Sequence, residues 1–195
     1  MNFGELKAAL LAEIGRAPSD LTYQLVTSDI NRALRVSEMV QSTTLTEAAS
    51  ITLPAGFLGV VDVYLDTDPR VTLTPTTKTA LNRSNRTGQT ACEYAIEDGI
   101  MYLNPAPQTT ETVNLTYYSR VADLSADSDT NDILTNYPSI YVYGALTHHA
   151  ALKQDAQKAA LWKVGYDDAI NGANKNDLKT KYAGAPIKVY AGTAP

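Results

Sequence analysis

The segment between Val113 and Asp155 constrains the fold more than any other part of this 195-residue chain. Apolar and polar side chains alternate through VNLTYYS, which is the period of a half-buried strand. An acidic loop follows, and because it contains no basic residue we expect it to be solvated. Pro138 then fits the first turn of a helix, where a missing N–H costs nothing, with Asn136 or Tyr137 as the cap. The segment therefore predicts a strand, an exposed loop and a long helix in that order.

Helical periodicity also marks the start of the chain. Apolar residues at three- and four-residue steps predict a helix that ends near Gly15 and lines one face with Phe3, Leu6, Leu10 and Ile14. A second helix should begin near Ser19 or Asp20. Its apolar stripe would consist of Leu21, Leu25, Ile30, Ala33, Leu34 and Met39. Thr22 and Thr27 lower its helix propensity, so its path could break near Thr27.

The last third of the chain predicts an αα-hairpin that packs against these two helices. Its first helix would bury a broad face made of Ile140, Tyr141, Gly144, Ala145, His148 and Leu152. Its second helix resumes after Gln154 and Asp155, and its apolar side would contain Leu161, Trp162, Gly165, Tyr166, Ala169 and Ile170. Close helix approach is allowed by the small residues Gly144, Ala145, Ala150 and Ala151.

The region from Ser42 to Arg120 is rich in threonine, valine, tyrosine and turn residues, which favours an antiparallel sheet. Asp98-Gly99 predicts a two-residue hairpin loop, and such a loop fixes the strand register. The expected pairs are Glu97 with Ile100, Ile96 with Met101, Ala95 with Tyr102, and Tyr94 with Leu103. This register gathers apolar side chains on one face, namely Tyr94, Ile96, Met101 and Leu103.

Two further elements are predicted in the same region. A strand after the Pro54-Ala55-Gly56 turn would direct one face to the core, with Phe57, Val61, Val63 and Leu65 on it. The sequence TPTTKTALNR from Thr74 predicts a capped helix with Pro75 near its first turn and Leu81 buried, followed by a frayed stretch from Asn85 to Gly88.

Composition excludes several classes of protein. Cys92 is the only cysteine, so an intramolecular disulfide is impossible and the chain suits a reducing cytoplasm. Glu5 and Glu13 interrupt the apolar positions of the first helix, which predicts no signal peptide, and no window is apolar enough for a transmembrane helix. Net charge is −5, yet residues 138–195 contain seven lysines and four aspartates, so the carboxyl end is cationic.

Catalytic and metal-binding signals are weak. His148 and His149 are the only histidines, and adjacent helical residues point about 100° apart, so the pair is not expected to bind one metal ion. The D-x-D-x-N run at Asp127 begins like a calcium loop, but its sixth position is Asp132 instead of glycine and its twelfth is Pro138 instead of glutamate. We therefore expect a soluble capping loop there.

Three segments carry a resemblance to a known family by their order and spacing. They are LPAGFLGVVDVYLD at Leu53–Asp66, YAIEDGIMYLNPAP at Tyr94–Pro107, and the strand, loop and helix from Val113, after which a helix follows with Ala160, Trp162 and Tyr166. Together they resemble the head-tail adaptor proteins of tailed bacteriophages, the connector subunits that form a ring beneath the portal vertex of the capsid.

With the periodicity above, this resemblance implies an α+β fold. A helical bundle of about four helices, two N-terminal and two C-terminal, would carry an inserted antiparallel β-rich domain. The expected divisions are residues 1–41 for the N-terminal helices, 42–122 for the β-rich insertion, 123–182 for the acidic loop and C-terminal helices, and 183–195 for an extended C-terminal arm.

The resemblance also implies a function. The chain would be a structural adaptor of the phage neck, with no enzymatic activity and no cofactor, that docks on the portal protein and joins the head to the tail. Identical subunits would close a dodecameric ring after assembly in the bacterial cytoplasm. DNA would pass through an axial channel without specific binding, a tail or further neck protein would bind below, and no membrane would be involved.

Two sets of residues are candidates for these contacts. An arm that binds the portal or a neighbouring subunit would contain Lys179, Lys181, Tyr182, Ile187, Lys188, Val189 and Tyr190. The acidic loop would face the channel or the tail through Asp123, Asp127, Asp129 and Asp132.

Two other functions remain open from the residues alone. The chain could be an accessory module that binds carbohydrate or a host surface, and it would then need a concave aromatic pocket built from Tyr64, Tyr94 and Tyr102. It could also be a hydrolase, which would require His148 or His149 to pair in space with a carboxylate.

Overall fold

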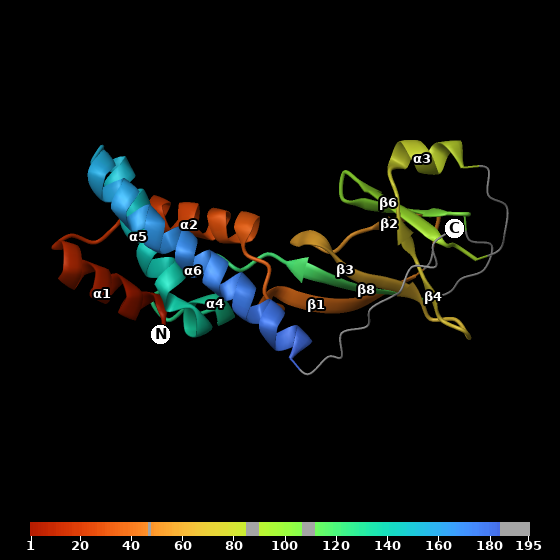
Figure 1. The fold of residues 1–195 in the computed structure, drawn as a ribbon, viewed down its shortest axis with the longest axis horizontal. Helices are drawn as coiled ribbons and strands as arrows, with labels where there is room; N and C mark the ends of the chain where they lie inside the picture. The colour runs from red at the N-terminus through yellow and green to blue at the C-terminus, as the bar shows by residue number, and fades with distance from the viewer. Residues whose placement is uncertain (47, 85–89, 107–111, 184–195) are drawn as a thin grey trace, which may run out of the picture. The chain divides into compact units, whose positions relative to one another are not determined.

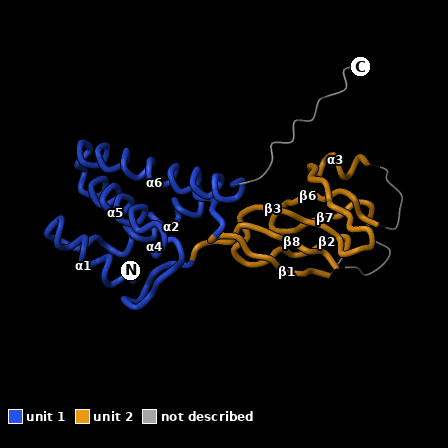
Figure 2. The backbone as a smooth tube through the Cα atoms, turned by 60° about the horizontal axis from the view of Figure 1, so that its bottom comes forward, with its two compact units in different colours: residues 1–37, 122–195 blue, residues 38–121 orange. Residues whose placement is uncertain are grey.

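The computed structural model describes residues 1–46, 48–84, 90–106 and 112–183, and these form a mixed α+β fold with two sheets (Figure 1). The α+β class predicted from the sequence is confirmed. The chain divides into two compact units, one made of Met1–Ser37 and Ala122–Pro195 and the other of Glu38–Val121 (Figure 2). The first unit is helical and the second contains both sheets.

Capping residues mark several helix ends in the first unit, but the second helix ends at Ala33, before Leu34 and Met39 of its predicted stripe. The helices of this unit are α1 (Phe3–Ile14), α2 (Asp20–Ala33), α4 (Asp132–Asn136), α5 (Pro138–Leu152) and α6 (Ala156–Tyr182). Asn2 accepts a hydrogen bond from the Glu5 backbone N–H at 2.8 Å, and the Glu5 carboxylate accepts one from the Asn2 N–H at 3.0 Å, which completes a capping box. Gly15 ends α1 in the left-handed conformation, with φ 68°.

The buried face of α2 differs from the predicted stripe. It consists of Thr22, Tyr23, Val26, Thr27, Ile30 and Asn31, whereas Leu21 is exposed. The helix continues through Thr27, whose hydroxyl donates to the Tyr23 carbonyl oxygen one turn earlier, at 3.1 Å. Threonine therefore contributes its methyl group to the core here while its hydroxyl is satisfied within the helix.

The predicted αα-hairpin of α5 and α6 is confirmed, and Pro138 opens α5 after Tyr137. Leu152 is exposed, so the predicted stripe of α5 extended one turn too far. Leu161 was predicted to be buried on α6 but is also exposed, because the buried face of this helix is narrow. That face consists of Tyr166, Ile170, Ala173 and Asp177.

At Gly144 the backbone of α5 lies close to side chains of two other helices, α2 and α6. A Cβ atom there would lie 3.0 Å from Tyr166 Cε2 of α6 and 3.0 Å from Val26 Cγ1 of α2. The absence of a side chain therefore sets the distance of α5 from both neighbours, as the small residues predicted.

The second unit consists of two four-stranded sheets. One has the order β1-β8-β3-β4 and the other β2-β7-β6-β5. The strands are β1 (Val40–Thr46), β2 (Ser50–Thr52), β3 (Phe57–Leu65), β4 (Val71–Thr72), β5 (Thr74–Pro75), β6 (Glu93–Glu97), β7 (Ile100–Asn104) and β8 (Thr112–Ser119). All pairs are antiparallel except β5 with β6, which is parallel. Apolar side chains from both sheets share one core.

The hairpin of β6 and β7 has the register that Asp98-Gly99 predicts. All four expected pairs are present, and both turn residues have positive φ, 51° and 75°, as a type I′ turn requires. Tyr94, Met101 and Leu103 are buried and Ile96 packs against the same core. This prediction is confirmed.

Two predictions in this unit are wrong. Two register shifts in β3, between Phe57 and Gly59 and between Val60 and Asp62, turn Val60 instead of Val61 toward the core. A short helix, α3 (Lys78–Arg83), begins after Thr77, while Pro75 belongs to β5. Leu81 is half-buried, since a helix of this length covers little of the sheet. The stretch from Asn85 to Gly88 lies outside the described residues.

The contact at Gly144 predicts opposite effects for two glycine-to-alanine changes. Gly144→Ala should lower the free energy of unfolding by about 1–3 kcal/mol, because the new methyl group overlaps Tyr166 and Val26. Gly172→Ala on α6 meets no atom within 4 Å and should raise it by about 0.5–1 kcal/mol through helix propensity. Urea unfolding measures both values, and equal stability of the two variants would refute the close approach.

Candidate functional site

The acidic loop between β8 and α4 holds the first turn of α1. The Phe3 N–H donates to the Asp129 carbonyl oxygen at 2.8 Å, and the Gly4 N–H donates to the Asp127 carbonyl oxygen at 2.9 Å. These N–H groups have no partner within the helix, so the loop satisfies them. Lys7 pairs with the Asp127 carboxylate. The predicted capping role of this loop therefore extends to a helix that is distant in sequence.

The side chains of the same loop stabilise its own turn. Asp129 accepts hydrogen bonds from the Ala126 N–H at 2.8 Å and from the Ser125 N–H and hydroxyl at 2.9 and 3.0 Å, and these donors lower the pKa of Asp129. Asn131 caps α4 by accepting from the Leu134 N–H at 2.8 Å. Asp123 and Asp132 are exposed, and they are the carboxylates of the predicted set that make no hydrogen bond or ion pair within the described residues.

Asp177 of α6 fixes the segment that follows α2. Its side chain is 5% exposed and accepts from the Ser37 N–H at 2.8 Å and from the Ser37 hydroxyl at 2.5 Å. Lys181 forms an ion pair with it at 2.8 Å. Burial alone would raise the pKa of Asp177, but the donors on Lys181 and Ser37 outweigh it and lower that pKa. One turn earlier, Asn174 accepts from the Arg35 N–H at 2.9 Å, so two residues of α6 hold this segment.

The predicted arm is described only in part. Lys181 is engaged by Asp177, whereas Lys179 and Tyr182 are exposed at the end of α6. Ile187, Lys188, Val189 and Tyr190 lie outside the described residues. The role of this segment in binding a partner stays a prediction.

One side of α6 exposes apolar side chains, a feature that the sequence reasoning missed. We call it the outer stripe, and it consists of Leu161, Val164, Leu178 and Tyr182. Leu161 and Val164 are 65% and 70% exposed. The four positions differ by 3, 14 and 4 residues, so they share one side of the helix, opposite the buried residues. This spacing could have been read from the sequence, but Leu161 was assigned to the core and Tyr182 to the arm, while Val164 and Leu178 were given no role. No helix of the described residues is long and apolar enough to cross a membrane.

His148 forms the spatial pair that a hydrolase would require. Its Nε2 lies 2.8 Å from Asp29 Oδ2 of α2, next to a cavity of about 360 Å³. The neighbouring Thr147 hydroxyl donates to the Tyr143 carbonyl oxygen at 2.7 Å, so it is not aligned on His148. Within the described residues, no serine, threonine or cysteine side chain hydrogen-bonds to His148. The pair therefore connects α5 to α2 without an activated nucleophile.

No three-residue cluster of histidine, cysteine, aspartate or glutamate in the described residues could hold a metal ion. Both histidines are half-buried, and burial together with Lys153 and Arg16 lowers the pKa of His149. Both imidazoles are therefore partly shielded from solvent.

The three tyrosines of the alternative binding module do not form one pocket. Tyr94 belongs to the core. Tyr102 pairs with Ala95, so it lies on the opposite face of the same hairpin, where Lys78 covers its ring. Tyr64 lines a separate hollow of about 390 Å³ on the other sheet, with Ser42, Thr44 and Thr116 among its neighbours. The predicted aromatic pocket is wrong, because strand register separates its residues.

Asp177 generates a prediction about stability and pH. Asp177→Asn should lower the free energy of unfolding by about 2 kcal/mol or more at pH 7, because Lys181 and Ser37 lose a charged acceptor. The pKa of Asp177 is lowered in the folded state, so its contribution is complete above the ordinary aspartate pKa of about 4 and is lost as pH falls below it. The gap between wild type and variant should therefore narrow at acid pH.

A matched control lies on the same helix. Asp167 pairs with Lys163 at 2.8 Å, but both side chains are exposed, so Asp167→Asn should change stability by less than about 1 kcal/mol. Thermal and urea unfolding at several pH values distinguish the two. A gap for Asp177→Asn that stays constant with pH would contradict the assignment.

Comparison with known proteins places the chain in a family. The family model of the SU10 adaptor protein matches residues 1–189, which include both compact units. A search of curated proteins finds no match. The chain therefore belongs to the SU10 adaptor protein family, and as a phage head-tail adaptor it is a structural component of the virion that interacts with other head and tail proteins.

Proposed function

We propose that the chain is the repeating subunit of a closed ring in the phage neck, which docks on the portal protein, joins the head to the tail and leaves an axial channel for DNA. The family match over residues 1–189 is the observation that carries this proposal. Adaptor proteins join two assemblies, here the head and the tail. A ring is the arrangement that can join them around a passage for DNA. The ring is dodecameric by the family resemblance.

Ring closure requires heterologous contacts, in which one surface of a subunit meets a different surface of the next. The outer stripe of α6 supports such a contact, because exposed apolar side chains on one side of a helix mark interaction surfaces. A helix of 27 residues is about 40 Å long, so the stripe could contact a neighbour along much of the subunit. We assign the outer stripe to the contact between adjacent subunits.

Charge supports the passage of DNA. A channel that gripped phosphates through many lysines would retard the genome, whereas an acidic subunit with net charge −5 repels it. The exposed carboxylates of Asp123 and Asp132 suit a surface that faces the channel or the tail. Lys179 and the arm beyond α6 suit the portal side, where a cationic segment meets an acidic partner.

Loss of the outer stripe should prevent ring formation. The double variant Leu161→Gln with Val164→Gln should remain folded, because both side chains are exposed, yet reduce assembly at least about tenfold by removing apolar contact area. Leu21→Gln is the control, since Leu21 is also an exposed leucine of the helical unit, 51% exposed, but lies on α2. Light scattering and negative-stain images of the chain mixed with its portal measure assembly. Normal rings from the double variant would refute this interface.

Docking on the portal should weaken as salt concentration rises if opposite charges guide it. At about 0.5 M salt the Debye length falls well below its value of about 8 Å at physiological ionic strength, so charge attraction between exposed groups is screened. Cosedimentation of the chain with portal particles at increasing salt measures this. Binding that does not change with salt would exclude the role given to the lysines.

A further inference from the structure

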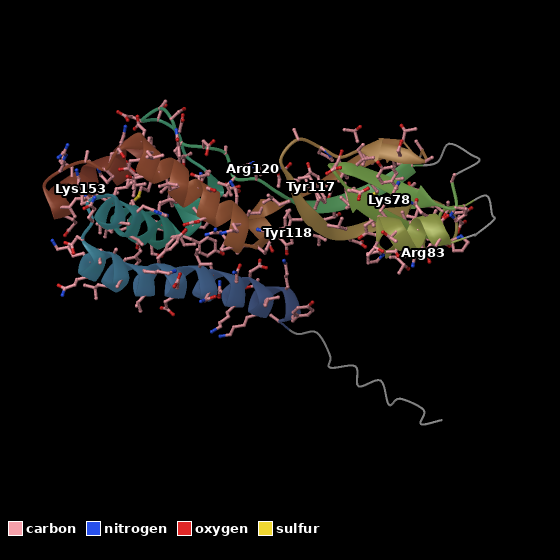
Figure 3. All side chains as sticks on the ribbon, turned by 90° about the horizontal axis from the view of Figure 1, so that it is seen from above. Lys78, Arg83, Tyr117, Tyr118, Arg120 and Lys153 are labelled. Atoms are coloured by element: carbon pink, nitrogen blue, oxygen red, sulfur yellow. The ribbon has the colours of Figure 1, made fainter. Side chains whose placement is uncertain are left out.

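A pocket of about 270 Å³ lies where the loop between α1 and α2 meets the end of α5. We call it the basic pocket, and its lining consists of Arg16, Ala17, Ser19, His149, Leu152 and Lys153. Lys153 follows the last residue of α5, at the turn into α6 (Figure 3). The pocket has no part in the interface proposed for the outer stripe, and no sequence motif pointed to it.

No carboxylate of the described residues neutralises the charges of the basic pocket. Neither Arg16 nor Lys153 forms an ion pair with a carboxylate of the described residues. Asp155, two residues after Lys153, pairs with Lys158 at 3.3 Å and caps α6 through the Lys158 N–H. Two cations therefore face one hollow in a chain whose net charge is −5.

The groups that lower the pKa of His149 show which charges surround it in the pocket. Its pKa is lowered by burial, by Lys153 and by Arg16, and no carboxylate contributes in the opposite direction. The charged groups that face it are Arg16 from the α1–α2 loop, Lys153 from the end of α5, and the Asp155–Lys158 pair, which lines an adjoining pocket with His149. The surroundings of this imidazole are therefore net positive.

The size and charge of the pocket favour a small oxyanion as its ligand. A guanidinium and an ammonium form charge-assisted hydrogen bonds to carboxylates and phosphates, and the volume exceeds the share of one water molecule, about 30 Å³, several times. A DNA backbone is instead bound by rows of basic residues that neutralise many phosphates. Two unpaired cations on an acidic protein do not make such a row, so a carboxylate of a protein is favoured.

We propose that the basic pocket is a socket for an acidic side chain of a partner protein, held between Arg16 and Lys153. The proposal takes only the class of partner, another protein of the assembly, from the proposed function. Protonation of His149 adds a third cation, so the socket binds its carboxylate more tightly as pH falls toward the pKa of His149. All residues that line the socket belong to one subunit, so its binding can be measured without ring formation.

The test is a titration of the isolated full chain with a hexaglutamate peptide, followed by NMR of the His149 ring. Bound carboxylate should raise the pKa of His149, because it offsets the two cations. The double variant Arg16→Gln with Lys153→Gln should bind the peptide at least about tenfold more weakly. In the absence of peptide, the same variant should have a higher His149 pKa than wild type. The control Arg83→Gln with Lys175→Gln removes the same charges from exposed positions outside the pocket and should bind as wild type.

Three outcomes overturn the socket, and a fourth overturns the part assigned to His149. Equal loss of binding in both double variants would show attraction to net charge alone. Binding of a DNA oligonucleotide in preference to the peptide would make the pocket a nucleic-acid contact, and a response to inorganic phosphate alone would make it an adventitious anion site. Binding independent of pH in wild type and in His149→Gln would remove the role of the imidazole. Ring assembly is measured in a separate experiment, so a failure of the ring proposal would not change the outcome of the peptide titration.

Discussion

The helical unit depends on how closely α5 can approach its neighbours. Helices α1, α2, α4 and α6 all contact α5, so its side chains decide the distances between the others. At Gly144 the backbone of α5 meets Val26 of α2 and Tyr166 of α6 with no side chain between them. Tyr141 and Ile140 of α5 are fully buried. A close-packed interior of this kind tolerates little change of volume.

Polar contacts then hold the first turn of α1 and the segment after α2 in place. The acidic loop supplies carbonyl oxygens to the first N–H groups of α1, and Asp177 supplies a carboxylate to the segment after α2. Of the acidic loop residues predicted to face a partner, Asp127 and Asp129 therefore make contacts within their own subunit. The charged groups left without such a task are the informative ones, because their exposure costs nothing in folding and can be used in binding.

Three surfaces of the helical unit therefore have different properties. The outer stripe of α6 is apolar, the basic pocket is cationic, and Asp123 and Asp132 leave carboxylates at the acidic loop. A head-tail adaptor must meet its own copies as well as unlike partners, and surfaces of different chemistry can distinguish these contacts. The sheet unit adds a neutral hollow lined by hydroxyl groups, next to Tyr64.

Local patterns in the sequence determined the elements of this protein. The hairpin at Asp98-Gly99, the end of α1 at Gly15 and the start of α5 at Pro138 each depend on backbone rules that involve a few neighbouring residues. The α+β class followed from the change of composition, and the family resemblance followed from the order of segments. These features need no knowledge of the rest of the fold.

Tertiary structure alone decided which face of each element is buried and which charges meet. Thr27 is in the core and Leu161 is exposed because contacts with other helices, not the apolar character of a side chain, define a buried face. Shifts of register in β3 turn Val60 instead of Val61 toward the core, and no alternation pattern in the sequence reveals such a shift. The pairs Asp177–Ser37 and His148–Asp29, and the pocket of Arg16 and Lys153, join residues more than a hundred positions apart, and only folding brings such groups within reach of one another.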